Sequence, residues 1–230
     1  MHLGARLETI GSMVQQYSSI ADIGTDHAYL PVWLIKNGII HHAIAADIAA
    51  GPCAAARHTI TQYDLQLLVD IRQGDGLAVL EPGEVANVIL AGMGASTMIE
   101  ILEARPRVVQ CLNSLILQPM IGVAQLREWA QRNNYTISAE SLCREAGHFY
   151  VVLVIKPNQR TTGRLSSLEL ELGPCLLKHR PPLLREYVEE LLQHYQYQLG
   201  QMRRGKDGEH HPKYQQLQQL CKELEVLQHG

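Results

Sequence analysis

The sequence predicts an α/β fold in which a mostly parallel sheet of seven strands is followed by a smaller helical region. Short apolar runs alternate with segments of helical spacing through residues 20–133, the pattern of five successive strand–helix units. Two further apolar runs, residues 135–143 and 148–155, are separated by only four residues. Because this connection is too short for a crossover helix, these strands form an antiparallel hairpin, which leaves one strand reversed.

The composition fits one such domain with an appendage. The chain has 230 residues, 46% of them hydrophobic, and contains a single Phe, so the core is aliphatic, as in buried parallel sheets. Five cysteines form no Cys-x-x-Cys pair, which favours reduced thiols and no metal site. The expected domains are residues 1–157, the α/β part, and residues 158–230, a helical hairpin that resembles a short coiled coil.

The charge pattern restricts the partners. The net charge of −3 is not that of a general nucleic-acid binder, although residues 158–230 are slightly basic, which is compatible with an RNA partner. The N-terminus has no signal-peptide pattern, and no apolar run approaches the length of a membrane span. We therefore expect a cytoplasmic protein that does not interact with membranes, with a monomer favoured.

The individual elements follow from periodicity and turn residues. Residues 1–19 carry apolar positions at helical spacing and predict an amphipathic helix against the sheet. Residues 157–163 predict a linker or turn. The remaining expected strands are 20–23, 43–48, a run within 67–73, 86–90 and 114–117; the remaining expected helices are 28–38, 51–62, 96–103, 122–133, 183–202 and 214–227, the last two antiparallel.

Several strands end in residues that suit a bound nucleotide. The first ends in Asp22-x-Gly24 before a helix N-terminus, where backbone N–H groups are available to a ligand. Asp47 ends the second strand, 23 residues beyond Gly24, near the spacing at which a carboxylate accepts hydrogen bonds from both ribose hydroxyls. Asp47 is alternatively the N-cap of the following helix, and one residue can do both.

Glycines mark two more strand ends. Gly74-Asp75-Gly76 is compatible with an ordinary turn, or with one carboxylate and bare backbone laid against an adenine edge. Gly92 and Gly94 follow the fourth strand and indicate a close approach of the backbone to something bound.

Together these features resemble a class I methyltransferase that binds S-adenosylmethionine, with a Rossmann-like seven-stranded sheet. More closely, the segments ADIGTDHAYLP, AADI, RQGDGL, AGMGA and LILQP resemble the bacterial TrmK-type tRNA (adenine-22-N1) methyltransferases. The resemblance implies tRNA as substrate and S-adenosyl-L-methionine as cofactor, bound by residues 1–157. It also implies the cofactor-binding residues: Asp22, Gly24, Thr25 and His27 under the methionine half, Asp47 at the ribose, Gly74, Asp75 and Gly76 at the adenine, and Gly92 and Met93 at the opening to the target base.

Two departures from general methyltransferases bear on the chemistry. The second glycine of Asp/Glu-x-Gly-x-Gly is replaced by Asp26, so the cofactor turn carries a carboxylate. The fourth strand lacks the Asn/Asp-Pro-Pro-Tyr that amino-group methylases use, so a ring nitrogen fits better than an exocyclic amine. Asp26 is the first candidate catalytic residue and His27 the second. The alternatives are a helix N-cap for Asp26 and a structural hydrogen-bonding role for His27.

Candidate RNA contacts are one aromatic and several basic side chains. Tyr29 is expected either to stack on a base or to be buried under the sheet. The basic candidates are Arg6, Arg57 and Arg72, expected near the cofactor mouth, and Arg203, Arg204 and Lys206 in the turn between the last two helices. For each of these cations a solvated surface position is the alternative.

Three other functions remain open at this stage. The first is a methyltransferase of the same fold that acts on rRNA, protein or a small molecule. The second is a non-catalytic RNA-binding module with a relic cofactor pocket. A nicotinamide dehydrogenase is the least favoured, because the first turn lacks Gly-x-Gly-x-x-Gly and the hairpin does not continue the parallel pattern.

Overall fold

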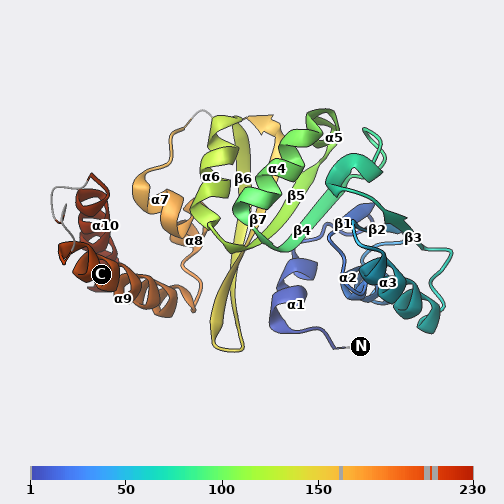
Figure 1. Cartoon of the computed structure of the whole chain (residues 1–230), viewed down its shortest axis with the longest axis horizontal. Coiled ribbons are helices and arrows are strands. Elements are labelled where there is room, and N and C mark those ends of the chain that lie inside the picture. The colour runs from blue at the N-terminus through green and yellow to red at the C-terminus, as the bar shows by residue number, and fades with distance from the viewer. Residues whose placement is uncertain (1, 161–162, 205–207, 209–211, 230) are drawn as a thin grey trace. The chain divides into compact units, whose positions relative to one another are not determined.

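The computed structural model describes residues 2–160, 163–204, 208 and 212–229, in two compact units, Met1–Gly163 and Arg164–Gly230 (Figure 1). Each unit is described by itself. Among the described residues, no helix is long and apolar enough to cross a membrane.

The first unit is built on one seven-stranded sheet with the order β3-β2-β1-β4-β5-β7-β6. Strands β1 to β5 pair in parallel, and β7 runs antiparallel to both β5 and β6. The seven strands are β1 (Ile20–Ile23), β2 (Ala43–Asp47), β3 (Val69–Gln73), β4 (Asn87–Gly94), β5 (Ser114–Ile121), β6 (Tyr135–Glu145) and β7 (His148–Arg160). The expected fold class, with its single reversed strand, is confirmed.

Helices cover both faces of this sheet (Figure 1). Ile20, Ala43 and Ile89 face a core shared with α1, α2 and α3. The opposite face packs against α4, α5 and α6. The helices of this unit are α1 (Ala5–Ser12), α2 (Tyr29–Lys36), α3 (Ala50–Gln62), the 3₁₀ turn η1 (Gly76–Val79), α4 (Ala95–Ala104), α5 (Pro106–Cys111) and α6 (Val123–Arg132). Because both faces are covered, β1 is buried along its whole length, which explains its continuous apolar run.

Three strands extend past the residues expected to end them. Strand β4 continues through Gly92 to Gly94, β5 continues through Pro119, and β7 continues through Pro157 to Arg160. The linker expected at residues 157–163 is therefore wrong as far as Arg160, and residues 161–162 lie outside the described part. Glycine and proline look like strand ends in a sequence, but irregular pairing accommodates Gly92 and Pro119 here.

The structure has more helices than expected, and its N-terminal helix is shorter than expected. The N-terminal helix covers only Ala5–Ser12, although Leu3 and Val14 beyond its ends are buried as their pattern predicts. The short helices α5, α7 and α8 were not predicted, because six residues are too few for a clear apolar period.

The second unit contains helices only within its described residues: α7 (Ser167–Leu172), α8 (Pro174–His179), α9 (Leu184–Arg203) and α10 (Pro212–His229). Gln196 bonds to Glu225 and Arg203 bonds to Tyr214, so α9 and α10 pack antiparallel, as expected. Helix α7 begins with a capping box formed by Ser166 and Glu169.

One buried ion pair connects α6 to the hairpin. Arg127 Nε donates to Glu140 Oε1 over 2.7 Å, and both side chains are 0% exposed. Charges removed from water in this way are tolerated only while they are paired, so each residue requires the other.

We predict that Glu140→Leu lowers the free energy of unfolding by about 3–5 kcal/mol, because it removes the carboxylate that pairs with the buried Arg127 charge. Urea unfolding followed by circular dichroism measures the loss. The matched control is Glu128→Ala, which removes an exposed pair with Arg132 at 3.7 Å and costs less than about 1 kcal/mol. A Glu140→Leu loss as small as that of the control would contradict the prediction.

Candidate active site

A cavity of about 450 Å³ opens at the carboxyl edge of the sheet, beside the ends of β1, β2, β3 and β4. This size is within the range of small-molecule sites. Its lining residues are Ile23, Gly24, Asp47, Ile48, Gly74, Asp75, Gly76, Leu77, Ala78, Met93, Thr97, Glu100, Ile101, Ala104 and Arg105.

The cavity brings together six of the residues expected to bind the cofactor. Gly24, Asp47, Gly74, Asp75, Gly76 and Met93 come from four strand ends and all line it. The other four expected residues, Asp22, Thr25, His27 and Gly92, lie beside these strand ends but do not line the cavity.

Two of the lining glycines have backbone conformations that other residues rarely adopt. Gly24 has φ +81°, and a Cβ built on it would lie 2.1 Å from Met93 Cε. Gly76 has φ +49°, and its Cβ would lie 2.9 Å from Ile101 Cγ2. The glycines therefore keep the backbone exposed to the cavity, where any side chain would be strained and crowded.

Asp47 ends β2 with one carboxylate oxygen engaged. Its Oδ1 accepts from the Ala49 N–H over 2.8 Å, while Ala49 is the N-cap residue of α3. Asp47 is therefore not the N-cap itself. Among the described residues its Oδ2 accepts no hydrogen bond, so an acceptor remains for a ligand.

Strand β1 carries a buried carboxylate, Asp22, just before the turn that leads to α2. Thr25 Oγ1 accepts from the Ala28 N–H over 3.2 Å, and Ala28 begins α2 in the left-handed conformation. Burial raises the pKa of Asp22 to about 6; a hydrogen bond from Thr25 opposes the rise and the negative charge of Asp47 adds to it. Asp22 is thus sensitive to any positive charge that binds nearby.

Arg72 fixes the loop that carries Gly74 to Gly76. Its guanidinium pairs with Glu84 at 2.6 Å and with Asp70 at 2.8 Å, and donates to the Val79 carbonyl. The hydrogen bond from Arg72 lowers the pKa of Glu84 to about 2. Arg72 thus shapes the cavity loop, and the guanidinium that was expected to meet RNA near the cofactor mouth is engaged by these partners.

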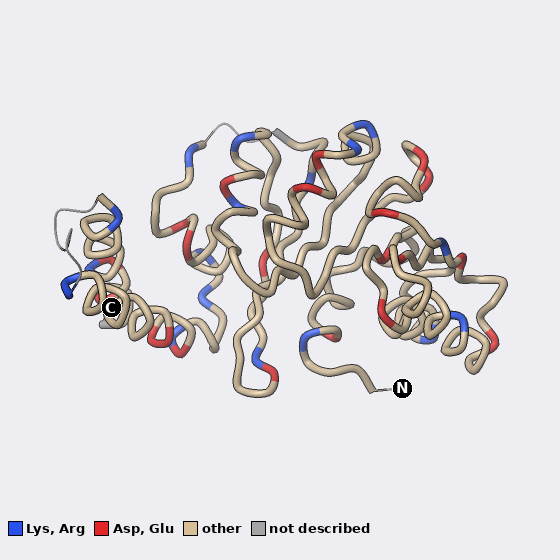
Figure 2. The backbone as a smooth tube through the Cα atoms, in the orientation of Figure 1, with Lys and Arg blue, Asp and Glu red and all other residues tan. Residues whose placement is uncertain are grey.

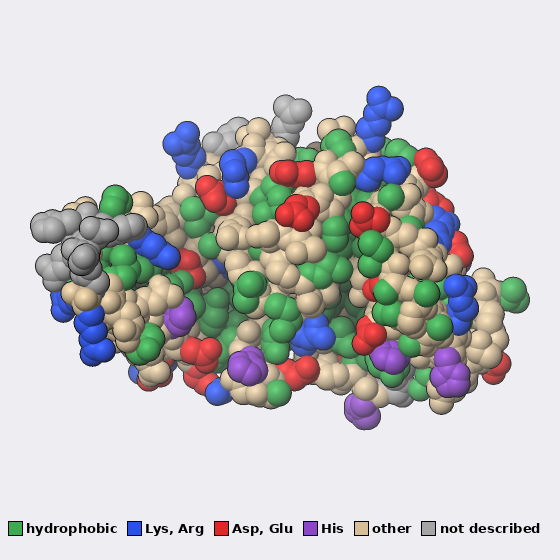
Figure 3. Space-filling view, in the orientation of Figure 1, with side chains coloured by type: hydrophobic (Ala, Val, Ile, Leu, Met, Phe, Trp, Pro, Cys, Tyr) green, Lys and Arg blue, Asp and Glu red, His purple; other side chains and the backbone are tan. Residues whose placement is uncertain are grey.

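One wall of the cavity was not predicted. Thr97, Glu100, Ile101 and Ala104 face it from α4, and Arg105 follows. Their three- and four-residue spacing after the glycine-bearing strand end was the signal available in the sequence. On the face in Figure 3, acidic side chains gather over α4 and beside the loop after β3. An acidic rim suits a ligand with net positive charge.

The two candidate catalytic residues lie outside the cavity. Asp26 is 81% exposed, and its Oδ2 lies 3.5 Å from His27 Nε2. Since the helix cap is Ala28, the N-cap alternative for Asp26 is wrong. The His27 ring stacks on Tyr29 with centroids 5.0 Å apart, and Tyr29 is exposed, so its burial under the sheet is also wrong.

A second group of side chains meets beyond Met93. Gly92 forms a bulge in β4 with φ +77°, and its N–H donates to Gln118 Oε1 over 3.3 Å. Arg6 Nη1 donates to the same oxygen over 2.7 Å, and the Arg6 guanidinium lies 5.9 Å from the centre of the Tyr150 ring. Arg6 thus reaches the strand ends from the N-terminal helix, whereas Gln118 was not predicted to act at the site.

The other basic candidates lie elsewhere. Arg57 lines a separate hollow with His42 and Asp70, at the amino ends of β2 and β3, which corrects its expected place near the cofactor mouth. Arg203 and Arg204 lie at the end of α9, where Arg203 donates to Tyr214 over 2.5 Å. Lys206 lies outside the described residues. Figure 2 shows both signs of charge interleaved along the backbone, without a continuous basic track in the described part.

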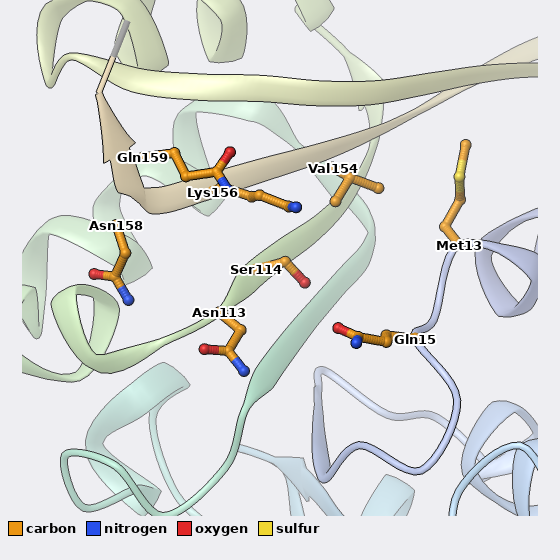
Figure 4. Close-up of a pocket in the computed structure, with 8 residues that line it drawn as sticks. All are labelled: Met13, Gln15, Asn113, Ser114, Val154, Lys156, Asn158 and Gln159. Atoms are coloured by element: carbon orange, nitrogen blue, oxygen red, sulfur yellow. The ribbon is translucent and has the colours of Figure 1, made fainter.

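A polar hollow of about 400 Å³ lies at the opposite, amino edge of the sheet (Figure 4). Asn113, Ser114 and Lys156 contribute to its lining, and it contains none of the predicted site residues. No group of three potential metal ligands occurs among the residues that the structure describes.

The strand order, the reversed β7 and the cavity at the carboxyl ends of β1 to β4 define a class I methyltransferase fold. A family model described as TrmK, tRNA (adenine(22)-N(1))-methyltransferase, matches residues 20–228. The chain belongs to this TrmK family.

Three similar proteins align with this chain over nearly its whole length. The tRNA (adenine(22)-N(1))-methyltransferase of Bacillus subtilis (strain 168) is 34% identical over 99% of this chain and 96% of its own. The structure of Streptococcus pneumoniae Sp1610 in complex with S-adenosyl-L-methionine has a TM-score of 0.86 and 29% identity, covering 99% of this chain and 100% of that one. M. capricolum TrmK in complex with S-adenosyl-homocysteine has a TM-score of 0.83 and 28% identity, covering 99% and 98%.

Proposed function

We propose that this protein transfers the methyl group of S-adenosyl-L-methionine to N1 of adenine 22 in the D-arm of bacterial tRNA. The observation that carries the proposal is the match of residues 20–228 to the TrmK family, in a chain where six of the ten predicted cofactor residues line one cavity. Such an enzyme acts in the cytoplasm, where its tRNA substrate is found. Residues 1–157 form the cofactor-binding domain in this proposal.

The residues present fit the cofactor. Gly24 and Gly76 present bare backbone to the cavity, and Asp75 and Glu100 line the same cavity. A ligand with a sulfonium and an ammonium group is favoured by these carboxylates. In this proposal Asp47 Oδ2 accepts from the ribose hydroxyls, and Gly74 to Gly76 border the adenine. Asp22, Thr25 and His27 support the methionine half.

The cofactor supplies an electrophilic methyl group when bound. The adenine N1 lone pair forms the new N–C bond while the C–S bond breaks and its electron pair stays on sulfur. Because N1 lies on the Watson–Crick edge, the target base must be unpaired or flipped to present it. Gly92 and Met93 border this opening, and the chain accelerates the reaction chiefly by holding N1 in line with the methyl group.

Asp26 and His27 are the proposed catalytic residues. Methylation makes the adenine ring cationic, and the exposed Asp26 carboxylate stabilises positive charge that develops there. The stacked pair of His27 and Tyr29 offers a flat aromatic surface to a base, an interaction worth about 1–3 kcal/mol. Arg6 and the exposed Arg204 are proposed phosphate contacts, whereas Arg72 and Arg57 are left out because of their positions.

The first prediction concerns the substrate. With labelled S-adenosyl-L-methionine, we expect methyl transfer to an unmodified tRNA transcript with adenine at position 22 and none to a transcript with guanine there. The matched pair differs only at the reacting base, so fold and charge of the RNA are unchanged. Label in neither transcript, with cofactor binding intact, points to another substrate and refutes the proposal.

The second prediction concerns pH. The pKa of Asp22 is raised to about 6 by burial, and a cationic cofactor favours its ionised form. Affinity for S-adenosyl-L-methionine is therefore at its plateau above pH 6 and falls below it, approaching tenfold per pH unit. Calorimetry from pH 5 to 8 measures this change. In Asp22→Asn the inflection near pH 6 disappears, and an unchanged inflection in that variant would contradict the assignment to Asp22.

The third prediction concerns the acceptor side. Asp26→Asn keeps the size of the side chain and removes its charge, so kcat falls at least about tenfold, which corresponds to about 1.4 kcal/mol in the barrier. The dissociation constant of S-adenosyl-L-methionine stays within twofold of wild type, since Asp26 does not line the cavity. Wild-type kcat in Asp26→Asn removes the proposed role.

A further inference from the structure

Gln118 is a fully buried polar side chain at the carboxyl end of β5, 0% exposed. Both ends of its amide are engaged. Oε1 accepts from Arg6 Nη1 and from the Gly92 N–H, while Nε2 donates to the Pro119 carbonyl over 2.9 Å and lies 3.8 Å from Met120 Sδ. These contacts fix which end of the amide faces Arg6.

The bulge in β4 explains one of these bonds. Ala91 pairs with Gln118 and Met93 pairs with Pro119, so Gly92 is an extra residue on β4. Its N–H would have no partner in the ladder, and the Gln118 side chain supplies one at 3.3 Å. Gln118 therefore holds the strand end on which Gly92 and Met93 lie.

The other hydrogen bond to Gln118 Oε1 comes from the Arg6 guanidinium, which is positively charged. Arg6 is partly buried and forms no salt bridge with the carboxylates that the structure describes. The Glu145 carboxylate is occupied by the Arg6 backbone N–H at 3.0 Å rather than by the guanidinium. A guanidinium has five N–H donors, and Gln118 is their one acceptor within the described part of the chain, which leaves donors for an anion.

We infer that Gln118 is a positioning residue, which aims the Arg6 guanidinium at the opening between cofactor and target base, where Arg6 receives an oxyanion. The inference deepens the proposed function and rests on it. The oxyanion has two sources at this place: a phosphate of the target nucleotide or the carboxylate of the cofactor's methionine half.

Neither a carboxylate nor an alkyl group can replace the amide of Gln118. A glutamate side chain in its place would still accept from Arg6, but it would neutralise the positive charge and lose the donation to Pro119. A leucine side chain would fill a similar volume, leave the Gly92 N–H unpaired and free the guanidinium to rotate away. Both substitutions keep a side chain in the space and remove the function.

The test combines Gln118→Leu, Gln118→Glu, Arg6→Gln and the double variant Arg6→Gln/Gln118→Leu. For each, kcat and KM are measured with the adenine-22 transcript, and the dissociation constants of tRNA and of S-adenosyl-L-methionine are measured directly. Each single variant is expected to lower kcat/KM at least tenfold. The loss in the double variant is expected to be smaller than the product of the two single losses, because Gln118 acts in part through Arg6.

Whether the variants lose affinity for tRNA or for the cofactor identifies which oxyanion Arg6 binds. A rise in KM and in the dissociation constant for tRNA, with cofactor binding within twofold of wild type, supports the phosphate. A tenfold weaker affinity for the cofactor, shared by its homocysteine product, supports the carboxylate. The inference is overturned if the loss of kcat/KM in the double variant equals the product of the two single losses. It is also overturned if Gln118→Glu has wild-type values of kcat, KM and both dissociation constants.

Ser114→Ala is the matched control. Ser114 lies at the other end of β5 and donates a buried hydrogen bond to Asn87 over 2.6 Å, so its loss perturbs the same strand far from Arg6. Its KM and cofactor affinity stay at wild-type values; a tenfold change there would assign the effects to strand stability and overturn the inference. If wild type fails to methylate tRNA, the proposed function fails, while the coupling of Arg6 and Gln118 is still read from the dissociation constants.

Discussion

The parallel pairing of β1 with both β2 and β4 is the constraint on which the rest of the site depends. The chain proceeds outward from β1 to β3 and then returns to β4 on the other side, so the loops after β1 and β4 diverge at this point. Such a divergence leaves a crevice at the carboxyl edge of the sheet. Because four strands end at this edge, residues far apart in the sequence, such as Gly24 and Asp75, line one cavity.

The cavity and the opening beyond it have opposite electrostatic character. Carboxylates of Asp47, Asp75 and Glu100 line the cavity, which suits a cation. On the far side of Met93 the Arg6 guanidinium lies without a carboxylate partner in the described part of the chain, which suits an anion. A nucleotide bound there would place its phosphate and its base at different positions relative to these charges, which fixes its orientation before reaction.

The sequence allowed prediction of those site residues that directly follow a strand. Asp47 and the Gly74 to Gly76 segment each directly follow a buried strand, so topology alone brings them together at one edge. Contacts between distant side chains could not be predicted in this way. The bond between Arg6 and Gln118 spans 112 positions, and the Arg72–Glu84 pair depends on how a loop folds back, so neither leaves a periodic signal. Strand ends at Gly92, Pro119 and Pro157 were misjudged because sheet pairing overrides local propensity.

Met93 connects the two halves of the site. Its side chain lines the cavity and its methyl group lies over Gly24, while the preceding residue, Gly92, is held by Gln118. Side chains alternate along a strand, and one extra residue in β4 changes which face the following side chains occupy. The bulge at Gly92 is compensated within two residues by an extra residue on β5, so the irregularity is confined to Met93 and its neighbours. A regular strand would offer no such local turn, so the conformation of Gly92 and the buried amide of Gln118 together direct Met93 toward the cavity.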